Sequence, residues 1–231
     1  MKKLISLFLS VSVLLLAACS KQPDTASSEQ KNDAAGLQTV VIASTGSDAD
    51  IWRHIASLPE TKAAGIKLEV KNFTDYVAMN TAVANKEVDL NAFQSYAYLV
   101  AFNAANKDKI APVSTTYLEP MGIYSNKVKK VEEFAQGATI AIPNDGANES
   151  RALLLLQSAG LIKLKPDFDP VKGTPADIIE NSKKIVIKPI QMATAVRVKD
   201  EVDAILLGNT LAMEGGLNVL KDAIYYEPID Q

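Results

Sequence analysis

Along this chain, segments with the apolar pattern of β-strands alternate with segments that have the apolar spacing of helices. Four short segments are either continuously apolar and rich in β-branched residues or alternate between apolar and polar positions, and both patterns predict β-strands. They cover residues 39–43, 66–70, 88–93 and 110–113. The stretches between them have the helical spacing of apolar residues, which predicts a chain that alternates strand and helix.

The predicted helices begin at side chains that can accept hydrogen bonds from the first turn. They cover residues 50–57, 76–83 and 95–102. Either Thr74 or Asp75 can cap the second helix, and Ser95 can open the third. Helices that regularly separate short strands indicate βαβ units around a mostly parallel sheet.

A second series of elements follows an extended segment at residues 117–124. Strands are predicted at 139–142, 184–190 and 203–207, short helices at 130–134, 150–158, 176–181 and 194–198, and strand or loop at 161–169. The pattern therefore predicts two α/β lobes, residues 37–119 with 226–231 returning to them and residues 120–225. A cleft between two lobes commonly binds a small ligand.

The segment from Thr139 to Gln157 is the strongest candidate for a binding site. It is a buried strand, a polar turn and a helix that Asp145 or Asn148 can cap and that carries Arg151 in its early turns. Ligands bind at the carboxyl ends of strands in open α/β sheets, and an arginine fork suits a carboxylate. The simpler alternative is that Arg151 pairs with a surface acid such as Glu149, and the segment alone leaves both open.

Composition excludes several classes of function. The chain has 231 residues, a net charge of −3 and 48% hydrophobic residues, with no basic block, which argues against nucleic acid as a partner. The single cysteine, Cys19, allows no intrachain disulfide, and the single histidine, His54, is expected to be structural. Because no carboxylate pair, Ser–His pair or metal cluster stands out, we expect neither catalysis nor a cofactor.

The first 36 residues resemble the leader of a bacterial lipoprotein. A basic start precedes an apolar segment up to Ala18 that is too short to span a bilayer as a helix, which predicts a signal peptide over residues 1–18. It ends in Leu16-Ala17-Ala18-Cys19, which resembles a lipobox, so Cys19 is the expected lipidation site. Residues 20–36 are polar and predict a disordered tether to the membrane.

Four motifs together resemble one family. They are residues 16–19, 73–76 with 89–94, 141–157 with 160–164, and Asn209-Thr210 after an apolar strand. This combination is similar to the MetQ/NlpA family, the lipoprotein solute-binding proteins of methionine ABC importers. The resemblance implies a two-lobed periplasmic-binding-protein-like fold of type II, in which each lobe is a mostly parallel sheet flanked by helices. It also implies a separate permease and ATPase as partners, and we expect a monomer.

The resemblance also implies roles for individual residues in binding L-methionine or a related small amino acid. Aromatic rings would enclose the side chain, an arginine would hold the carboxylate, and two asparagines would supply hydrogen bonds. Carried over by motif, these residues are Tyr76, Phe93, Tyr98, Arg151, Asn148 and Asn209. For any one ring alone, core packing is the simpler interpretation, and either asparagine could instead be a cap or turn residue.

Two departures from the family affect the expected ligand. Many members have histidine where this chain has Ser95, which leaves D-methionine, a methionine dipeptide or another apolar amino acid as alternatives. Family members usually continue beyond the position of Gln231, so an apparently truncated chain with an exposed apolar flank on the first lobe and a weakened site is expected. A surface adhesin or antigen with a vestigial site is therefore the other alternative.

Overall fold

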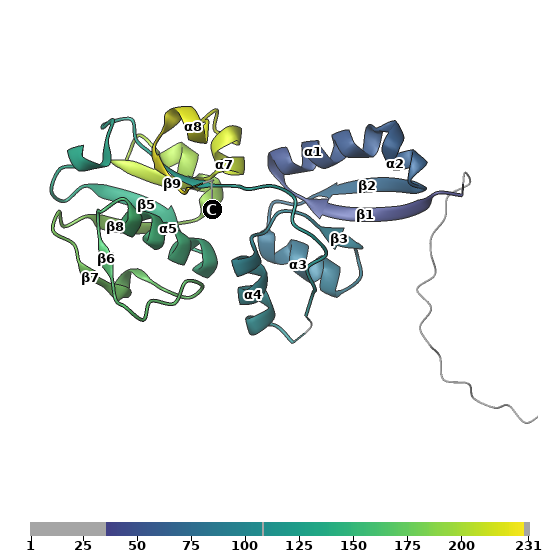
Figure 1. The fold of residues 1–231 in the computed structure, drawn as a ribbon, viewed down its shortest axis with the longest axis horizontal. Coiled ribbons are helices and arrows are strands. Elements are labelled where there is room, and N and C mark those ends of the chain that lie inside the picture. Colours follow the sequence, from purple (N-terminus) through teal and green to yellow (C-terminus); the bar gives the residue numbers. More distant parts are fainter. Residues whose placement is uncertain (1–35, 108, 229–231) are drawn as a thin grey trace, which may run out of the picture. The chain divides into compact units, whose positions relative to one another are not determined.

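The computed structural model describes residues 36–107 and 109–228, and the structural statements below concern these residues (Figure 1). The predicted signal peptide, Cys19 and nearly all of the predicted tether lie outside the described residues. The described chain contains a three-stranded sheet, a five-stranded sheet and a two-stranded ladder.

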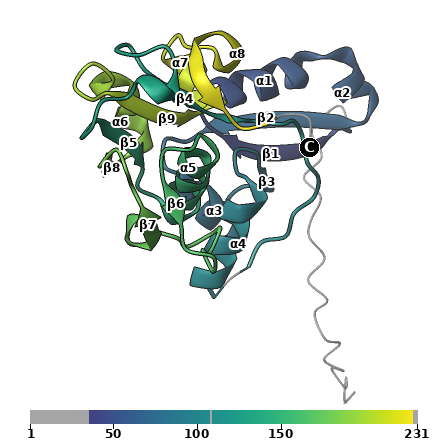
Figure 2. The same ribbon diagram turned by 60° about the vertical axis from the view of Figure 1, so that its left-hand side comes forward.

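The three-stranded sheet is entirely parallel and has the order β2-β1-β3. Its strands are β1 (Gln38–Ser44), β2 (Ile66–Asn72) and β3 (Leu90–Asn91). Four helices accompany it: α1 (Gly46–Ser57), α2 (Pro59–Ala63), α3 (Tyr76–Ala84) and α4 (Tyr96–Ala105). Figures 1 and 2 show α1 and α2 on one face of this sheet and α3 and α4 on the other. The predicted βαβ arrangement is therefore present in this region.

Two helix starts in this region follow from single side chains. The Asp75 carboxylate accepts a hydrogen bond from the backbone N–H of Ala78 at 2.7 Å, so Asp75 and not Thr74 caps α3. Ser95 Oγ accepts from the N–H of Tyr98 at 3.2 Å and caps α4, as predicted. Both caps satisfy N–H groups that a helix start leaves without an intrahelical partner.

The five-stranded sheet is mixed, with the order β10-β4-β9-β5-β8. Its strands are β4 (Met121–Tyr124), β5 (Thr139–Pro143), β8 (Val186–Ile190), β9 (Ala204–Gly208) and β10 (Ala223–Tyr226). β5 runs parallel to β8 and β9, whereas β4 pairs antiparallel with both β9 and β10. The ladder β6 (Lys163–Leu164) and β7 (Ile178–Glu180) is antiparallel.

Alternation along β5 separates two apolar cores. Ile140 and Ile142 belong to the cluster that contains Leu153 and Leu156 of α5 (Gly146–Ser158). Ala141 belongs instead to a second cluster, which is packed by α6 (Met192–Ala195), α7 (Asn209–Glu214) and α8 (Val219–Asp222). Successive side chains of a strand point to opposite faces, so this sheet is covered on both sides. Figure 2 shows α5 on one side of the sheet and α7 and α8 on the other.

Short 3₁₀ turns complete this region, at Val131–Glu133, Pro175–Asp177 and Val196–Val198. The predicted helix at 176–181 is wrong in its second half, because residues 178–180 form β7 and pair with β6. Thr174 and Asp177 close a capping box around the preceding turn, and Pro175 favours the first position of such a turn. The apolar character of residues 178–179 therefore serves a strand and not a helix.

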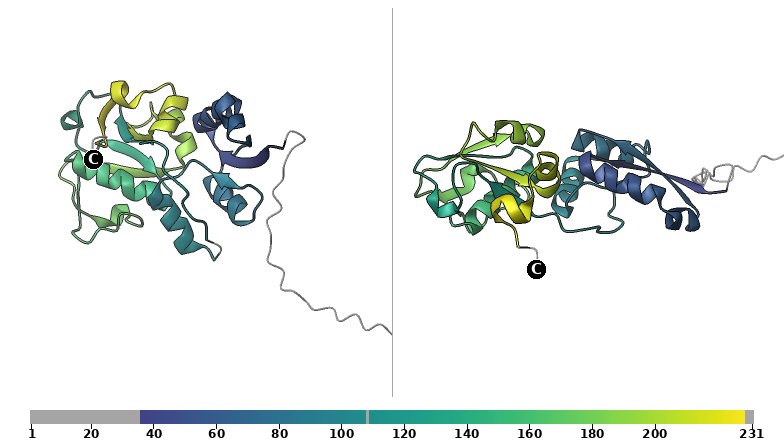
Figure 3. Two further views of the ribbon diagram at one scale, coloured as in Figure 1. Left: turned by 45° about the vertical axis from the view of Figure 1, so that its right-hand side comes forward. Right: turned by 90° about the horizontal axis from the view of Figure 1, so that it is seen from above.

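The predicted strand at 110–113 is also wrong. Residues 109–120 contain neither helix nor strand, as Figure 3 shows for the extended connection that leads to β4. Pro112 has no N–H to donate to a ladder, and Val113 exposes 81% of its surface. The apolar residues of this segment thus lack the neighbouring strand that a short β-run requires.

Two kinds of feature are absent from residues 36–107 and 109–228. None of the helices there combines the length and the apolar character needed to cross a membrane. No group of three or more His, Cys, Asp or Glu side chains there is arranged to hold a metal ion.

Candidate functional site

The three aromatic residues predicted for the site are in mutual contact. Tyr76 begins α3, Phe93 lies just after β3, and Tyr98 lies in the first turn of α4. The centroids of the rings are 5.3 Å apart for Tyr76 and Phe93, 5.7 Å for Phe93 and Tyr98, and 6.1 Å for Tyr76 and Tyr98. Two of the three pairs are edge-to-face, a favourable geometry for aromatic rings. All three rings are half-buried, and we refer to them as the aromatic trio.

A cluster of amides around the buried Asn80 holds the aromatic trio in place. Asn80 of α3 is fully buried and donates from Nδ2 to Gln94 Oε1 at 2.9 Å. Its own oxygen accepts from Asn91 and from Gln94, each at 2.8 Å. Because Asn91 and Gln94 flank Phe93, this network fixes the Phe93 segment against α3. A buried polar network with every member satisfied specifies one arrangement of the chain.

The two tyrosines of the trio remain neutral over the ordinary pH range. Burial is the largest cause that raises the pKa of Tyr98 to about 12, followed by the negative charges of Asp145 and Asp75. Burial likewise raises the pKa of Tyr76, assisted first by the charge of Glu119. Both hydroxyls therefore keep their protons and can act as hydrogen-bond donors, although negatively charged carboxylates surround them.

Arg151 lies on α5 and is paired with an acid far away in sequence. Its Nε donates to Glu227 Oε1 at 2.7 Å and its Nη2 to Glu227 Oε2 at 2.5 Å, a bidentate pair. Nη2 also donates to the backbone oxygen of Glu119 at 2.5 Å. Of the two acids, Glu227 and not the neighbouring Glu149 is therefore the partner. Burial, the largest influence, lowers the pKa of Arg151, but pairing with Glu227 outweighs it and the net pKa is raised.

The two asparagines lie at the same edge of the five-stranded sheet. Asp145 caps α5 by accepting from the N–H of Asn148 at 3.1 Å, and the Asn148 side chain donates to the same carboxylate at 2.9 Å. Asn209 directly follows β9, and its Nδ2 donates to the sulfur of Met213 at 3.4 Å. Since β5 and β9 are parallel neighbours, the carboxyl end of β9 and the turn that leads into α5 lie at one edge.

A second network near this edge was not predicted from the sequence. Asp48 of α1, only 6% exposed, accepts from the hydroxyl of Tyr117 at 2.5 Å and from that of Thr210 at 3.0 Å. The N–H of Thr210 donates to Glu119 Oε1 at 2.8 Å. Burial raises the pKa of Glu119, although its hydrogen bonds with Thr210 oppose the shift. These bonds join α1, the connecting segment and α7.

No local signal in the sequence could have identified these partners. Glu227 lies 76 residues from Arg151, and Thr210 lies 162 residues from Asp48. The only hint for Glu227 is that a charged residue directly follows an apolar, tyrosine-rich strand, which a surface residue would equally explain.

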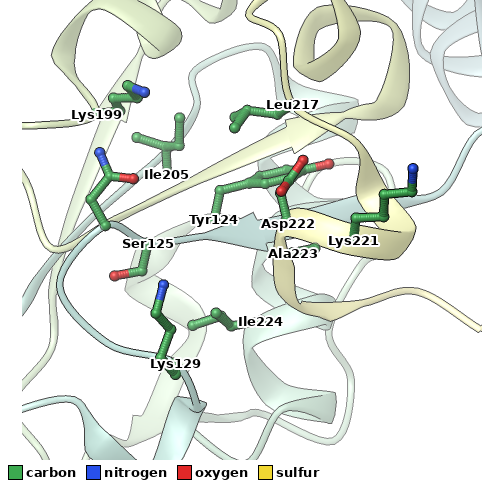
Figure 4. Close-up of a pocket in the computed structure, with 11 residues that line it drawn as sticks. Tyr124, Ser125, Lys129, Lys199, Ile205, Leu217, Lys221, Asp222, Ala223 and Ile224 are labelled. Atoms are coloured by element: carbon green, nitrogen blue, oxygen red, sulfur yellow. The ribbon is translucent and has the colours of Figure 1, made fainter.

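A cavity with a volume of about 320 Å³ lies elsewhere in the described part of the chain (Figure 4). It is lined by Tyr124 and Ile205, which pair at the opposite end of β4 and β9 from Gly208 and Asn209. Its charged lining residues are Lys129, Lys199, Lys221 and Asp222. The six predicted site residues do not line this cavity, so it is separate from the candidate site.

Comparison with known proteins gives the affiliation of the chain. A structure of a nutrient binding protein from Burkholderia cenocepacia bound to methionine is 35% identical, with a TM-score of 0.79 over 83% of this chain and 80% of that one. The substrate binding protein of a methionine transporter from Streptococcus pneumoniae is 40% identical, with a TM-score of 0.75 over 83% of this chain and 76% of that one. The α/β fold with parallel-rich sheets flanked by helices is thus that of substrate-binding proteins.

Sequence relatives agree with this fold. A protein of Pasteurella multocida named a probable D-methionine-binding lipoprotein MetQ is 36% identical over 228 residues, which cover 99% of this chain and 82% of that protein. A family model described as NlpA lipoprotein matches residues 40–231. The predicted resemblance is confirmed, and the chain belongs to the NlpA lipoprotein family.

Proposed function

We propose that this protein is a lipid-anchored extracytoplasmic binding protein that captures methionine and delivers it to an ABC importer. Family membership and similarity to a methionine-bound protein and to a methionine-transporter component support this function. The observation that carries it is the aromatic trio beside α5, the helix that carries Arg151. Tyr98 of the trio lies on α4, and α4 contacts α5.

The chemistry of the candidate site suits each part of methionine. A thioether makes favourable contacts with aromatic rings, so the aromatic trio would receive the side chain. Arg151 would bind the carboxylate with charge-assisted hydrogen bonds. Asn148 and Asn209, at one edge of the sheet, would supply further hydrogen bonds to the carboxylate or the ammonium group.

The transport cycle follows from this site. Methionine would bind between lobes formed by residues 37–119 and 120–225, with residues 226–231 returning to the first lobe. It would thereby favour a closed form over an open one in proportion to its affinity for each. Lipidation of Cys19 would hold the monomer at the outer face of a membrane, beside a separate permease and ATPase. The protein itself performs no catalysis in this scheme.

Calorimetric titration of the full chain in detergent with L-methionine tests the proposal. We expect saturable binding, and we expect Arg151→Ala to weaken it by at least tenfold, because hydrogen bonds to charged groups are worth roughly 1.5–3 kcal/mol. Arg53→Ala is the matched control, since Arg53 forms an exposed pair with Asp50 on α1. A folded wild type that does not bind methionine would refute the proposal.

A related ligand is the second candidate, and Ser95 motivates it. Ser95 caps α4 beside the aromatic trio, where many family members carry the larger histidine. Three relatives are also named as probable D-methionine-binding lipoproteins. Competition with D-methionine and a methionine dipeptide separates these ligands. If either displaces bound L-methionine while L-methionine at excess cannot displace it, the L-methionine assignment is wrong.

A further inference from the structure

The side chain of Glu227 is held from two directions. Its carboxylate accepts two hydrogen bonds from Arg151, at 2.7 and 2.5 Å, and a third from the backbone N–H of Met121 at 2.7 Å. The backbone N–H of Glu227 in turn donates to the oxygen of Met121 at 3.0 Å. Glu227 is thus fixed beside β4 by its main chain and by its side chain.

These contacts use one side of the Arg151 guanidinium completely. The group has five N–H donors. Nε is used by Glu227, and Nη2 is shared between Glu227 and the backbone oxygen of Glu119. Within residues 36–107 and 109–228, Nη1 forms no hydrogen bond, so no described group uses either of its N–H donors.

Two roles for Glu227 are compatible with a carboxylate-binding arginine. Glu227 could occupy the place of the ligand carboxylate and compete with it, or it could orient Arg151 so that Nη1 faces the ligand. Competition would require a ligand to break two charge-assisted bonds and leave the Met121 N–H to find a new acceptor. Because unmade hydrogen bonds of buried groups are costly, this geometry favours orientation.

We propose that Glu227 is a positioning residue that holds the guanidinium of Arg151 and presents Nη1 to the carboxylate of an amino-acid ligand. The inference rests on the proposed function, because it requires that Arg151 binds a ligand carboxylate. Glu227 itself does not touch the ligand. It fixes the direction of the Arg151 side chain. Because the side chain is already ordered, it loses less conformational entropy when the ligand binds.

The test compares L-methionine with L-methioninamide, which lacks the carboxylate, in calorimetric titrations of the full chain in detergent. Glu227→Gln keeps the size of the side chain and an oxygen for the Met121 N–H, but it removes the charge and one acceptor for Arg151. We expect Glu227→Gln to raise the Kd for L-methionine about tenfold. The Kd for L-methioninamide should change less than about threefold, because that ligand has no carboxylate for Nη1.

Glu180→Gln is the matched control. Glu180 also pairs with a basic residue, Lys163 at 2.6 Å, but on the β6–β7 ladder, so its change should alter neither affinity. Thermal unfolding reports whether each variant is folded. If Glu227→Gln does not fold, Glu227→Asp retains the charge with a shorter reach and should still weaken L-methionine more than L-methioninamide.

Each other outcome has a defined meaning. Tighter binding of L-methionine by Glu227→Gln would show competition and overturn the proposal. Equal weakening of both ligands would assign Glu227 a purely structural role, and unchanged affinities would show no role at all. If the folded wild type binds neither ligand, the proposed function fails and this inference fails with it.

Discussion

The two main sheets differ in how their apolar surfaces are covered. The five-stranded sheet is packed on both faces, and Leu153, Leu156 and Leu207 are completely buried there. The buried apolar cluster of the three-stranded sheet contains only Ala43, Met79, Ala82 and Val88, with half-buried residues around it. Exposed large apolar side chains do not separate the two regions, because the helices of both carry them, such as Val77 and Tyr96 in the first and Met213 and Leu220 in the second.

This difference between the two regions shows where the same residues serve both packing and the candidate binding site. Tyr76 and Phe93 of the aromatic trio pack against the small cluster of the three-stranded sheet. Arg151 lies on α5, but other residues of that helix, such as Leu153, form its buried apolar side. Changes to the candidate site should therefore affect folding in the first region and mainly affinity in the second.

The largest expected effect comes from removing apolar volume in each region. Leu206→Ala should destabilise the protein by about 3–5 kcal/mol, because Leu206 is buried in a densely packed cluster that cannot collapse around the cavity. Met79→Ala should cost nearer 2 kcal/mol, because the smaller cluster can relax. Denaturant unfolding combined with hydrogen exchange of each region measures both. A larger loss for Met79→Ala would reverse the comparison.

Ligand binding should sharpen the same contrast. At a methionine concentration of about 100 times Kd, the folded state gains about 2.7 kcal/mol. Because the aromatic trio belongs to the thinly packed region, amides of α3 and α4 should gain more protection than those of β5 and β9. Hydrogen exchange with and without methionine provides the measurement. Equal gains in protection for the two sets of amides would show that methionine does not order the three-stranded region through the aromatic trio.

Alanine substitutions at two glycines separate the destabilising effect of crowded packing from that of backbone strain. A Cβ at Gly122 of β4 would lie 3.0 Å from Tyr124 and 3.0 Å from Ala223, so Gly122→Ala should cost about 1–3 kcal/mol. Gly65, before β2, has φ of +74° and open space around it, so Gly65→Ala should cost only about 1 kcal/mol, from the backbone. Thermal unfolding compares the two, and a costlier Gly65→Ala would contradict the packing argument.

The smallest effects concern acids with lowered pKa values. The N–H of Thr139, at 2.7 Å, and then Lys127 hold the pKa of Asp203 below its ordinary value. A lowered pKa in the folded state means that ionised Asp203 stabilises the fold above its unfolded pKa and that this stabilisation is lost as pH falls through the folded pKa. Asp203→Asn should thus cost about 1 kcal/mol at pH 7, and this cost should disappear as the pH falls through the folded pKa of Asp203.

Glu69 in β2 is the counterpart in the three-stranded sheet. Its pKa is also lowered, first by a hydrogen bond with Lys67, but the carboxylate is exposed and screened by solvent. Glu69→Gln should change stability less than Asp203→Asn at pH 7 in parallel denaturant titrations. An equal or larger change for Glu69→Gln would mean that exposure does not decide the effect.

Local features of the fold could be predicted from the sequence. The strands at 39–43 and 139–142 and the cap at Ser95 follow from spacing and side-chain chemistry within a few residues. The strand predicted at 110–113 fails because pairing depends on a neighbour that the segment does not specify. The aromatic trio could be proposed only through family resemblance. Glu227 and Asp48 could not be predicted, since their partners are brought together by the tertiary fold alone.

The position of β1 has a mechanical consequence. β1 is the central strand of its sheet, paired from Gln38 to Ser44 with β2 and at residues 42–43 with β3. A pull transmitted through the residues before Gly36 therefore enters the fold along this strand. Such a force acts in shear on parallel ladders, so the hydrogen bonds share the load and do not open one after another. If the protein is tethered by its N-terminus, drag from flowing solvent would load β1, a strand that is paired on both sides.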